Sequence, residues 1–339
     1  MGFDIILFDT IFISMKDRKK DIKDSLLFGP VPSRRLGISL GVDLVPYKTC
    51  TMDCVYCESG ATTKLTLDRT EFFPVADVIA VLGEYLAGDP KLDYITFSGA
   101  GEPTLHSGIG EIIAFIKREY PKYKIALLTN GMLLSDIDTF NEVKDVDLIV
   151  PSLDAADEET FRKINRPVDG FKFSGLIDSF RRFHEISDAE FILEIFIIPD
   201  INDTPSSLKL FADAIEFINP DKVQLNSLDR PGTEKWVPKM TESGMERIRK
   251  ALSGRVKIEI VGKFIPSESA NIANSPEEYK NIDQKIVDFI SRRPGTMEDF
   301  KVSLGYSEAT IEKVLYRLIE KSVITSEKRE RGEFFTLKK

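Results

Sequence analysis

The sequence predicts an α/β protein whose main part is a sheet of parallel strands curved into an incomplete barrel. Over residues 28–265, short apolar runs alternate with segments whose apolar residues recur at helical spacing. Strands separated by helices of this length form right-handed βαβ units in a parallel sheet. From about residue 275 the alternation ends, and the remaining pattern is typical of three helices and a β-hairpin. The chain is therefore expected to fold as a barrel followed by a smaller domain.

The individual elements of the barrel can be placed from their apolar patterns. Strands are expected at 38–45, 94–98, 124–129, 148–153, 190–198, 223–228 and 256–261. Helical patterns lie between them at 75–82, 109–116, 158–163, 173–186, 208–215 and 241–252. Gly88 and Pro121 are suited to end the first two helices, and Pro199 to end the fifth strand. Six or seven such units suit a partial (β/α)6 TIM-like barrel, in which the chemistry lies on loops at the carboxyl ends of the strands.

Composition and length narrow the class of protein. With 339 residues, 42% hydrophobic and 30% charged, the chain has the composition of a soluble globular protein long enough for two domains. Its net charge of −9 argues against nucleic-acid binding over the whole surface. No apolar run approaches the ~20 residues of a membrane span, and the N-terminus lacks the basic segment of a signal peptide. The segment 1–27 is expected to be a partly disordered extension, within which Met15 is an alternative start.

All three cysteines lie within eight residues, in the stretch PYKTCTMDCVYCESG. Thiolates at Cys50, Cys54 and Cys57 can hold one face of a cubane iron–sulfur cluster. Such clusters usually take four cysteines, so one iron would stay open for another ligand. The alternatives are a zinc site, a redox pair or buried structural cysteines. A structural zinc needs four ligands, and the nearest histidine, His106, is far along the chain. A cluster would place the protein in a reducing compartment such as the cytoplasm.

The C-x3-C-x2-C spacing, with the aromatic Tyr56 before the last cysteine, resembles the signature of the radical S-adenosylmethionine (SAM) superfamily. The phrases GPVPSRRLG, GVDLVPYKTC and LNSLDRPG resemble a group of archaeal and bacterial members that is distantly similar to the wybutosine-synthesis enzyme of tRNA modification. The resemblance covers about residues 28–262. It implies a [4Fe–4S] cluster and SAM as cofactors, and ferredoxin or flavodoxin as electron donor. Reductive cleavage of SAM would then give a 5′-deoxyadenosyl radical that abstracts hydrogen from a substrate.

Glycines and polar residues follow the next two predicted strands. In the superfamily a G-G-E-P-like motif at the first of these places binds the amino group of SAM. Gly99, Gly101 and Glu102, in the sequence SGAGEP, resemble that motif. Glycine allows a ligand to approach the backbone closely, although a tight turn alone would also explain it. Thr129 and Asn130 end the following strand in a turn that also resembles the family.

Polar residues after the later strands complete the set that the resemblance implies for SAM binding. Ser152 and Asp154 resemble residues that hydrogen-bond the SAM ribose, and a helix N-cap is the alternative role of Asp154. Arg166 either faces the SAM carboxylate or covers the barrel rim. Glu194 lies within the apolar strand FILEIFIIP, where a carboxylate is costly unless it is paired. It is expected to contact a ligand or to form a structural ion pair.

Several other polar residues carry weaker signals. Arg34 and Arg35 precede the first strand, and they either face solvent or bind a carboxylate or phosphate through bidentate hydrogen bonds. Asn226 and Arg230, in QLNSLDRPG, are candidates for contact with substrate or cofactor. His184 lies on a predicted helix and is expected to be structural.

The segment 280–339 is expected to form a second domain, joined to the barrel by a linker at 266–279. Its three helices and a hairpin around Arg331 resemble a winged helix-turn-helix domain. It carries 13 Lys and Arg against 10 Asp and Glu, which leaves contact with nucleic acid and contact with protein both open. We interpret the chain as a radical SAM enzyme whose winged helix recruits an RNA or protein substrate. The alternative is an iron–sulfur transcription regulator that reads DNA through the winged helix.

Overall fold

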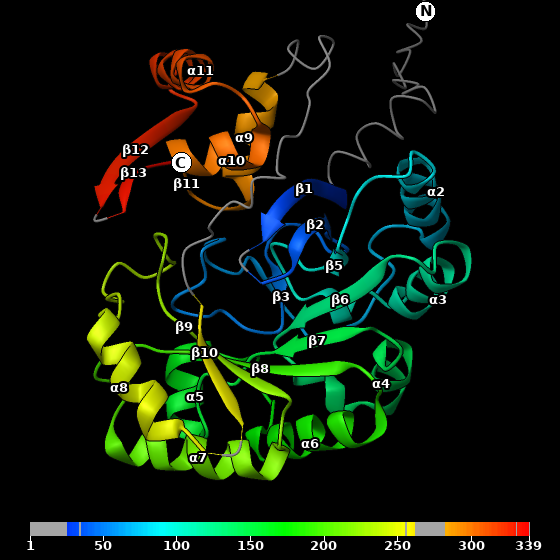
Figure 1. The fold of residues 1–339 in the computed structure, drawn as a ribbon, viewed down its shortest axis with the longest axis vertical. Helices are drawn as coiled ribbons and strands as arrows, with labels where there is room; N and C mark the ends of the chain where they lie inside the picture. Colours follow the sequence, from blue (N-terminus) through cyan, green and yellow to red (C-terminus); the bar gives the residue numbers. More distant parts are fainter. Residues whose placement is uncertain (1–25, 34, 255, 262–281, 330, 339) are drawn as a thin grey trace, which may run out of the picture.

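The computed structural model of the chain describes residues 26–33, 35–254, 256–261, 282–329 and 331–338. Arg34, nearly all of the expected N-terminal extension and the whole expected linker at 266–279 lie outside these residues. Within them, no helix is both long and apolar enough to cross a membrane. Figure 1 shows the barrel in blue to yellow and the C-terminal domain in orange and red.

The central element is an eight-stranded sheet with the order β1-β2-β5-β6-β7-β8-β9-β10. Only the first neighbours, β1 and β2, pair antiparallel, and all other neighbours are parallel. Its strands are β1 (Leu27–Ser33), β2 (Gly37–Val42), β5 (Tyr94–Phe97), β6 (Lys124–Thr129), β7 (Leu148–Pro151), β8 (Glu190–Phe196), β9 (Lys222–Asn226) and β10 (Lys257–Ile260). The pairing of the described residues leaves β1 and β10 as edges, so the predicted partial barrel is confirmed.

Helices cover the outer face of this sheet (Figure 1). The α-helices of the barrel are α2 (Val75–Leu86), α3 (Ile109–Glu119), α4 (Ile137–Val143), α5 (Glu158–Asn165), α6 (Leu176–Ile186), α7 (Pro205–Ile218) and α8 (Glu242–Leu252). Short 3-10 helices are η1 (Pro103–Leu105), η2 (Met132–Ser135) and η3 (Phe173–Gly175). Apolar residues of these helices and of alternate strand positions form one large core, which includes Ile95, Leu127, Phe180 and Phe191.

The inner face of the sheet carries fewer apolar side chains than the outer face and is more polar. Ala126, Leu148, Val150 and Ile192 form a small apolar cluster there. Because side chains alternate along a strand, Glu194 on β8 shares this face with Ile192, two residues before it. A charged residue thus lies inside the barrel, as the pattern of the strand predicted.

Elements that the sequence pattern did not indicate include β1, α4 and β11. The extended segment with Pro30 and Pro32 forms β1, which fits an edge strand because proline cannot donate to a second neighbour. Helix α4 has only seven residues, and its cap, Asp136, accepts a hydrogen bond from the amide of Thr139. So short a helix gives little periodic signal. The dipeptide β11 (Gly295–Thr296), in the C-terminal domain, pairs with β13 (Gly332–Leu337).

The C-terminal domain has its own apolar core, built around Ile286, Phe300 and Leu315. Its further elements are α9 (Ile282–Arg292), α10 (Met297–Leu304), α11 (Glu308–Glu320), β12 (Ile324–Arg329) and β13 (Gly332–Leu337). Its three strands pair in the order β11-β13-β12. The order helix, strand, helix, helix, hairpin agrees with the expected elements, while the winged-helix interpretation stays a prediction. The domain lies against the edge of the barrel, with α10 next to β1 (Figure 1).

Candidate functional site

The cysteine loop follows β2 at the carboxyl edge of the barrel and is held by loops from other strands. Its short strand β3 (Thr49–Cys50) pairs with β4 (Lys64–Leu65). On one side the Thr49 carbonyl accepts a hydrogen bond from the amide of Glu102, at 3.1 Å. On the other side the Val55 amide donates to the carbonyl of Ile164, at the end of α5. The loop is therefore clamped between the segments that follow β5 and β7.

Each cysteine sulfur has a nitrogen donor close to it, and the three donors come from different parts of the chain. Lys48 Nζ lies 3.1 Å from Cys57 Sγ. The side-chain amide nitrogen of Asn165 lies 3.4 Å from Cys54 Sγ, and that of Asn130 lies 3.7 Å from Cys50 Sγ. Donors of this kind stabilise sulfur in its thiolate form, which is the form that binds iron.

The arrangement of the three cysteines fits a cluster better than a single metal ion. None of them forms a disulfide, and all three are partly exposed. Among the described residues, no three Cys, His, Asp or Glu side chains converge on one ion position. In a cubane each thiolate binds its own iron, so the sulfurs need not converge. The donor set therefore suits a [4Fe–4S] cluster with one open iron and does not suit a four-ligand zinc site.

Burial keeps two of these thiols protonated in the protein without metal. It raises the pKa of Cys50 to about 12, with a smaller contribution from the charge of Glu102. Burial and the nearby Asp154 likewise raise the pKa of Cys54 well above its usual value. For Lys48, burial alone lowers the pKa, but the attraction of the cysteine sulfurs outweighs this and the pKa is raised overall. Binding of a cluster must therefore release protons from the thiols.

Glu102 joins the turn after β5 to the turn after β6. Its side chain is 2% exposed, and Oε1 accepts from the amide and hydroxyl of Thr104 and from the hydroxyl of Thr129. Among the described residues, the donor to Oε2 is the amide of Asn130, at 2.8 Å. Burial raises the pKa of this carboxyl group. The expected cofactor residues Glu102, Thr129 and Asn130 are thus brought together, with room for one further donor at Oε2.

The two glycines of the predicted SAM-binding turn are needed for contacts within the protein. A Cβ atom at Gly99 would lie 2.1–2.3 Å from the carboxylate of Asp43, which accepts the amide of Ala100. A Cβ atom at Gly101 would lie 2.0 Å from the carbonyl oxygen of Thr49, next to Cys50. If Gly101 served only to let SAM approach the backbone, a side chain there would obstruct SAM and leave the cluster intact. The contact with Thr49 indicates instead that it would displace the cysteine loop.

A buried network connects Cys54 to the residues that follow β7. Asp154, 1% exposed, accepts hydrogen bonds from the hydroxyl of Tyr56 at 2.5 Å, the amide side chain of Asn165 at 2.6 Å and the backbone of Phe196 at 3.0 Å. The Tyr56 ring stacks on that of Phe196, with centroids 3.8 Å apart. Burial raises the pKa of Asp154 to about 6. The helix N-cap considered for Asp154 is wrong, because Asp157 caps α5.

The remaining expected residues occupy two separate places. Ser152 pairs with Glu194 through a bridge between their backbones, and Glu194 forms an ion pair with Arg35 across the barrel interior. Arg166, in a left-handed conformation, pairs with Glu234 at 2.7 Å and lies 3.9 Å from Asp53. Arg166 is thus held at the rim, and Glu194 is held in the interior as one partner of an ion pair.

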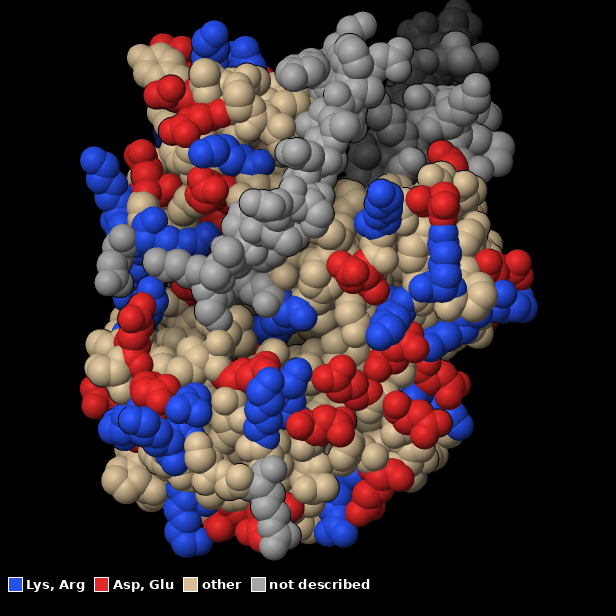
Figure 2. All heavy atoms as spheres, in the orientation of Figure 1, with Lys and Arg blue, Asp and Glu red and all other residues tan. Residues whose placement is uncertain are grey.

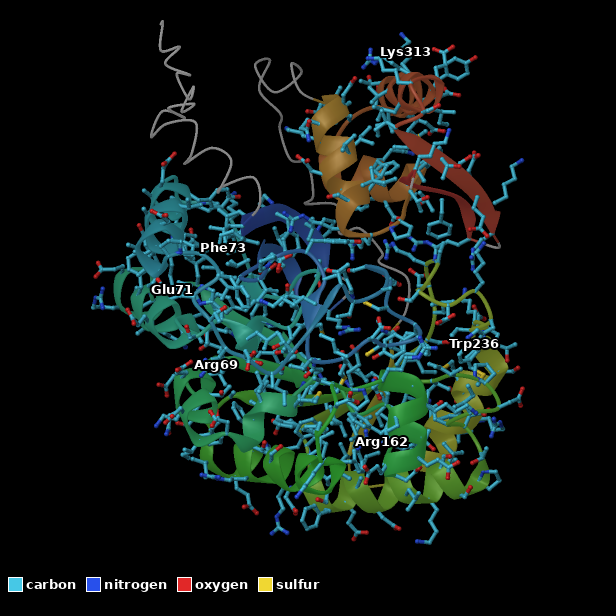
Figure 3. All side chains as sticks on the ribbon, turned by 180° about the vertical axis from the view of Figure 1, so that it is seen from behind. Arg69, Glu71, Phe73, Arg162, Trp236 and Lys313 are labelled. Carbon is cyan, nitrogen blue, oxygen red and sulfur yellow. The ribbon has the colours of Figure 1, made fainter. Side chains whose placement is uncertain are left out.

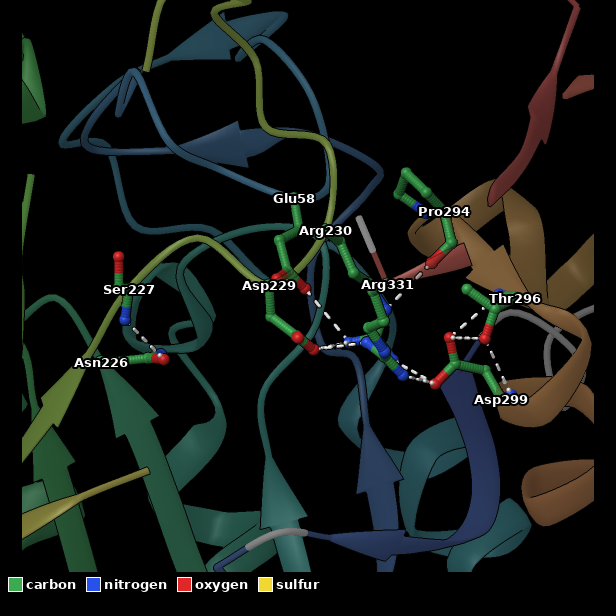
Figure 4. A network of polar contacts seen from close by, with 9 residues as sticks. All are labelled: Glu58, Asn226, Ser227, Asp229, Arg230, Pro294, Thr296, Asp299 and Arg331. Atoms are coloured by element: carbon green, nitrogen blue, oxygen red, sulfur yellow. Dashed lines mark hydrogen bonds and ion pairs between the residues drawn. The ribbon is translucent and has the colours of Figure 1, made fainter. Parts of the chain in front are cut away.

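Arg230 does not face the cysteine loop as a free side chain but joins it to the C-terminal domain (Figure 4). Its guanidinium is 6% exposed, donates to the Pro294 carbonyl at 3.0 Å and pairs with Asp299 at 2.6 Å. It also lies 3.6 Å from Glu58, which directly follows Cys57. Arg331 of the hairpin contacts Asp299 and Asp229. This cluster of charged residues fixes the C-terminal domain beside the site.

The other weak candidates are structural or lie apart. His106 is fully buried, with Nε2 2.9 Å from the Phe73 carbonyl and Nδ1 accepting the Gly108 amide. His184 lies 3.9 Å from Asp221 on the outer side of the sheet, as expected for a structural residue. Asn226 ends β9, where its side chain accepts the amide of Ser227.

Sequence reasoning missed four residues of the site: Lys48, Asp43, Thr51, whose hydroxyl accepts the side-chain amide of Asn130 at 2.8 Å, and Asn165. The first three lie on the segment around the cysteine loop. Asn165 is the last residue of α5 and donates to both Cys54 and Asp154. The sequence shows that Asn165 precedes Arg166 near the end of a helix. The orientation of its side chain toward the cysteines, however, depends on how α5 packs.

Comparison with known proteins agrees with this geometry. The profile of the radical SAM superfamily matches residues 44–210, from just before the cysteine loop into α7. A UPF0026 protein of Methanocaldococcus jannaschii is 34% identical over 264 residues, which cover 75% of this chain and 80% of that protein. A protein named GTPase Obg, from Brachyspira hyodysenteriae, is 30% identical over 319 residues. That match covers 94% of this chain but only 46% of the other protein, so the chain spans less than half of it.

More distant proteins also match this chain, and their names describe different activities. A radical SAM methyltransferase from Sphaerobacter thermophilus superposes with a TM-score of 0.52 at 17% identity, covering 66% of this chain and 65% of that one. Sequence relatives at 23% and 26% identity are a probable RNA methyltransferase of Clostridium acetobutylicum and a GTP 3′,8-cyclase of Thermodesulfovibrio yellowstonii. The chain belongs to the radical SAM superfamily, which uses a [4Fe–4S] cluster and SAM, and within it groups with the UPF0026 proteins.

Proposed function

We propose that the protein is an enzyme that cleaves SAM reductively to a 5′-deoxyadenosyl radical, which then takes a hydrogen atom from a substrate. The observation that carries the proposal is the cysteine triplet at the carboxyl edge of the barrel, with a nitrogen donor beside each sulfur. When bound, the cluster supplies the single electron that breaks the C5′–S bond of SAM. Ferredoxin or flavodoxin is the proposed source of that electron.

The residues of the chain would hold and orient the two cofactors. Cys50, Cys54 and Cys57 would bind three irons of the cluster. Glu102 Oε2, which accepts one protein hydrogen bond, would accept the amino group of SAM as its second. Ser152 follows β7 on the same edge of the sheet as the cysteine loop, and this position supports contact with the ribose. The contact proposed between Asp154 and the ribose requires Asp154 to leave its buried hydrogen bonds with Tyr56 and Asn165. The contact proposed between Arg166 and the SAM carboxylate requires Arg166 to leave Glu234.

The comparisons support an enzyme and do not identify its substrate. The names of two relatives describe methylation of RNA and cyclisation of GTP. Related proteins thus act on different substrates, and the fold alone does not identify the substrate. The regulator alternative accounts for the cysteines and the C-terminal domain. It gives no reason for the glycine turn or for the polar residues that follow each strand. We therefore retain only the enzyme.

The proposal is tested by turnover of SAM. Anaerobically reconstituted, reduced protein should convert SAM slowly into 5′-deoxyadenosine and methionine without added substrate. Chromatography of the reaction mixture should be paired with an iron assay of the same sample. Cys54→Ala should lose both the iron and the product. Iron-replete, reduced wild-type protein that yields no 5′-deoxyadenosine, even with cell extract present, would contradict the proposal.

A further inference from the structure

Residues 229–237, which follow β9, form a bridging segment that contacts both the cysteine loop and the C-terminal domain. On the side of the cysteine loop, the hydroxyl of Thr233 donates a hydrogen bond to the carbonyl of Cys57 at 3.1 Å. The amide of Glu234 donates to the carbonyl of Val55 at 2.9 Å. The bridging segment therefore holds the backbone of the cysteine loop on both sides of its last turn.

Gly232 brings the bridging segment into close contact with the cysteine loop between these two hydrogen bonds. A Cβ atom at Gly232 would lie 2.8 Å from the carbonyl oxygen of Tyr56, so a side chain there would push the two segments apart. Cys50, at the other end of the loop, is held differently, because its carbonyl accepts the amide of Thr66 at 3.0 Å. Cys50 and Cys57 are therefore positioned by different parts of the chain.

On its other side, the bridging segment is tied to the C-terminal domain by Arg230 (Figure 4). The guanidinium donates to the carbonyl of Pro294 at 3.0 Å and to the carboxylate of Asp299 at 2.6 Å. The same guanidinium lies 3.6 Å from Glu58, the residue that directly follows Cys57. One buried side chain thus contacts the domain and the end of the cysteine loop at the same time.

The domain is docked on the barrel by further specific ion pairs. Arg331 of the hairpin contacts Asp229, the first residue of the bridging segment. Arg292, at the end of α9, lies 3.5 Å from Asp43. Elsewhere the domain has a surface of mixed charge, with Lys and Arg interspersed among Asp and Glu on the face seen in Figure 2. Docking thus depends on individual pairs, and the pairs of Arg230 and Arg331 both include the bridging segment.

We propose that the docked C-terminal domain positions Cys57 as a ligand of the cluster, and that Arg230 and the bridging segment transmit this effect. The inference rests on the proposed function, in which Cys57 binds the cluster. Arg230 is then a positioning residue, because it acts on the site through the backbone of the cysteine loop. Coupling between two binding events is reciprocal. A docked domain therefore strengthens binding of the cluster, and a bound cluster strengthens docking of the domain.

The first test compares the reactivity of the cysteines in metal-free, reduced protein. Arg331→Glu places a carboxylate against Asp229 and Asp299, and it should undock the domain without a direct change at the cysteine loop. Because like charges in contact strongly disfavour docking, alkylation of Cys57 should become about tenfold faster, while that of Cys50 should stay nearly unchanged. Arg331→Lys, which keeps the charge, should resemble the wild type. Tandem mass spectrometry after a short pulse of iodoacetamide measures each rate.

Arg317→Glu is the matched control for this variant. It breaks the ion pair of Arg317 with Asp283 within the same domain. Arg317 lies on α11, the helix that carries Lys313 at the outer end of the domain (Figure 3). Alkylation in this control should match the wild type. A general loss of stability would accelerate Cys50 and Cys57 together, so the difference between the two cysteines identifies the transmitted effect.

The second test measures the reciprocal effect by hydrogen exchange. In the wild type, anaerobic reconstitution with iron and sulfide should slow exchange of the bridging segment and of β1, the strand that lies next to α10. In metal-free Arg331→Glu, exchange of β1 should be faster than in the metal-free wild type. A chelator should also remove iron faster from reconstituted Arg331→Glu than from the wild type or Arg317→Glu.

Four results would overturn the inference. They are an unchanged alkylation rate of Cys57 in Arg331→Glu, equal acceleration of Cys50 and Cys57, unchanged exchange of β1 in that variant, and exchange of β1 in the wild type that does not respond to the cluster. The proposed function is judged separately. Iron-replete, reduced protein that yields no 5′-deoxyadenosine would contradict that function alone, because the alkylation and exchange measurements require no SAM.

Discussion

The ammonium group of Lys48 lies 3.1 Å from the sulfur of Cys57, and the lysine is 2% exposed. Its backbone is fixed as well, because its carbonyl accepts the amides of Thr63 and Lys64. Lys48 therefore places a positive charge beside one of the three cluster ligands. A buried charge at this position should favour the more negative, reduced state of a bound cluster.

Lys48→Met should make the cluster harder to reduce. Two unit charges about 5 Å apart at an effective dielectric constant of about 20 interact by about 3 kcal/mol, so removing the ammonium should lower the midpoint potential measurably. Lysine and methionine are equally unfavourable in the left-handed backbone conformation at this position, so the substitution mainly removes the charge. The measurement is a redox titration followed by electron paramagnetic resonance. Lys64→Met, at an exposed position on β4, is the control, and an unchanged or higher potential in Lys48→Met would be inconsistent with this role.

Gly101→Ala should lose iron as well as SAM cleavage. Its Cβ atom would meet the carbonyl oxygen of Thr49 at 2.0 Å, a backbone atom that cannot move without displacing Cys50. We expect less than half of the wild-type iron after reconstitution, measured by an iron assay on folded protein. Gly175→Ala is the control, because no atom lies within 4 Å of the Cβ position there. Full iron content in Gly101→Ala would show that the loop can relax around the added methyl group.

Arg230→Met should release the C-terminal domain from the barrel. The arginine is 6% exposed, and its loss removes one partner of Asp299, Asp229 and Glu58, of which the two aspartates keep their contacts with Arg331. Removing one partner of a buried ion pair costs about 3–5 kcal/mol. Hydrogen exchange of α10 and β1 should therefore become much faster. Arg247→Met, which removes an exposed ion pair with Asp203 expected to contribute at most about 1 kcal/mol, should leave that exchange unchanged.

Asp154 should make the metal-free protein less stable as the pH rises. Its pKa is raised from 3.8 to about 6 by burial, so the folded state binds the proton more tightly than the unfolded state. Stability is then greatest below the unfolded pKa and is lost as the pH rises through the folded one. Between pH 4 and 7 the wild type should lose about 2–3 kcal/mol relative to Asp154→Asn. Urea unfolding of both proteins at each pH measures this, and parallel pH profiles would contradict it.

The sequence allowed the barrel to be predicted correctly, and it is also the source of the prediction of the metal ligands, because both depend on local pattern. Strands such as β6 and helices such as α3 matched their expected positions, since an apolar run or a helical stripe needs no knowledge of distant contacts. The role of Gly101 could not be predicted, because it arises from contact with Thr49, a residue far along the chain. The same holds for Arg331. It was expected on an exposed wing, and it contacts Asp229 of the barrel.

We propose that SAM binds to an open iron of a cluster held by Cys50, Cys54 and Cys57, and the other proposals for the site depend on this binding. The most direct measurement is electron–nuclear double resonance of the reduced cluster with SAM labelled in its amino nitrogen and its carboxylate oxygen. We expect hyperfine coupling from both labels, because SAM would bind the open iron through both groups. We also expect Glu102→Gln to weaken SAM binding by on the order of 1–3 kcal/mol without loss of iron. A reduced, iron-replete cluster whose spectrum shows no coupling from either label at saturating SAM would contradict the claim.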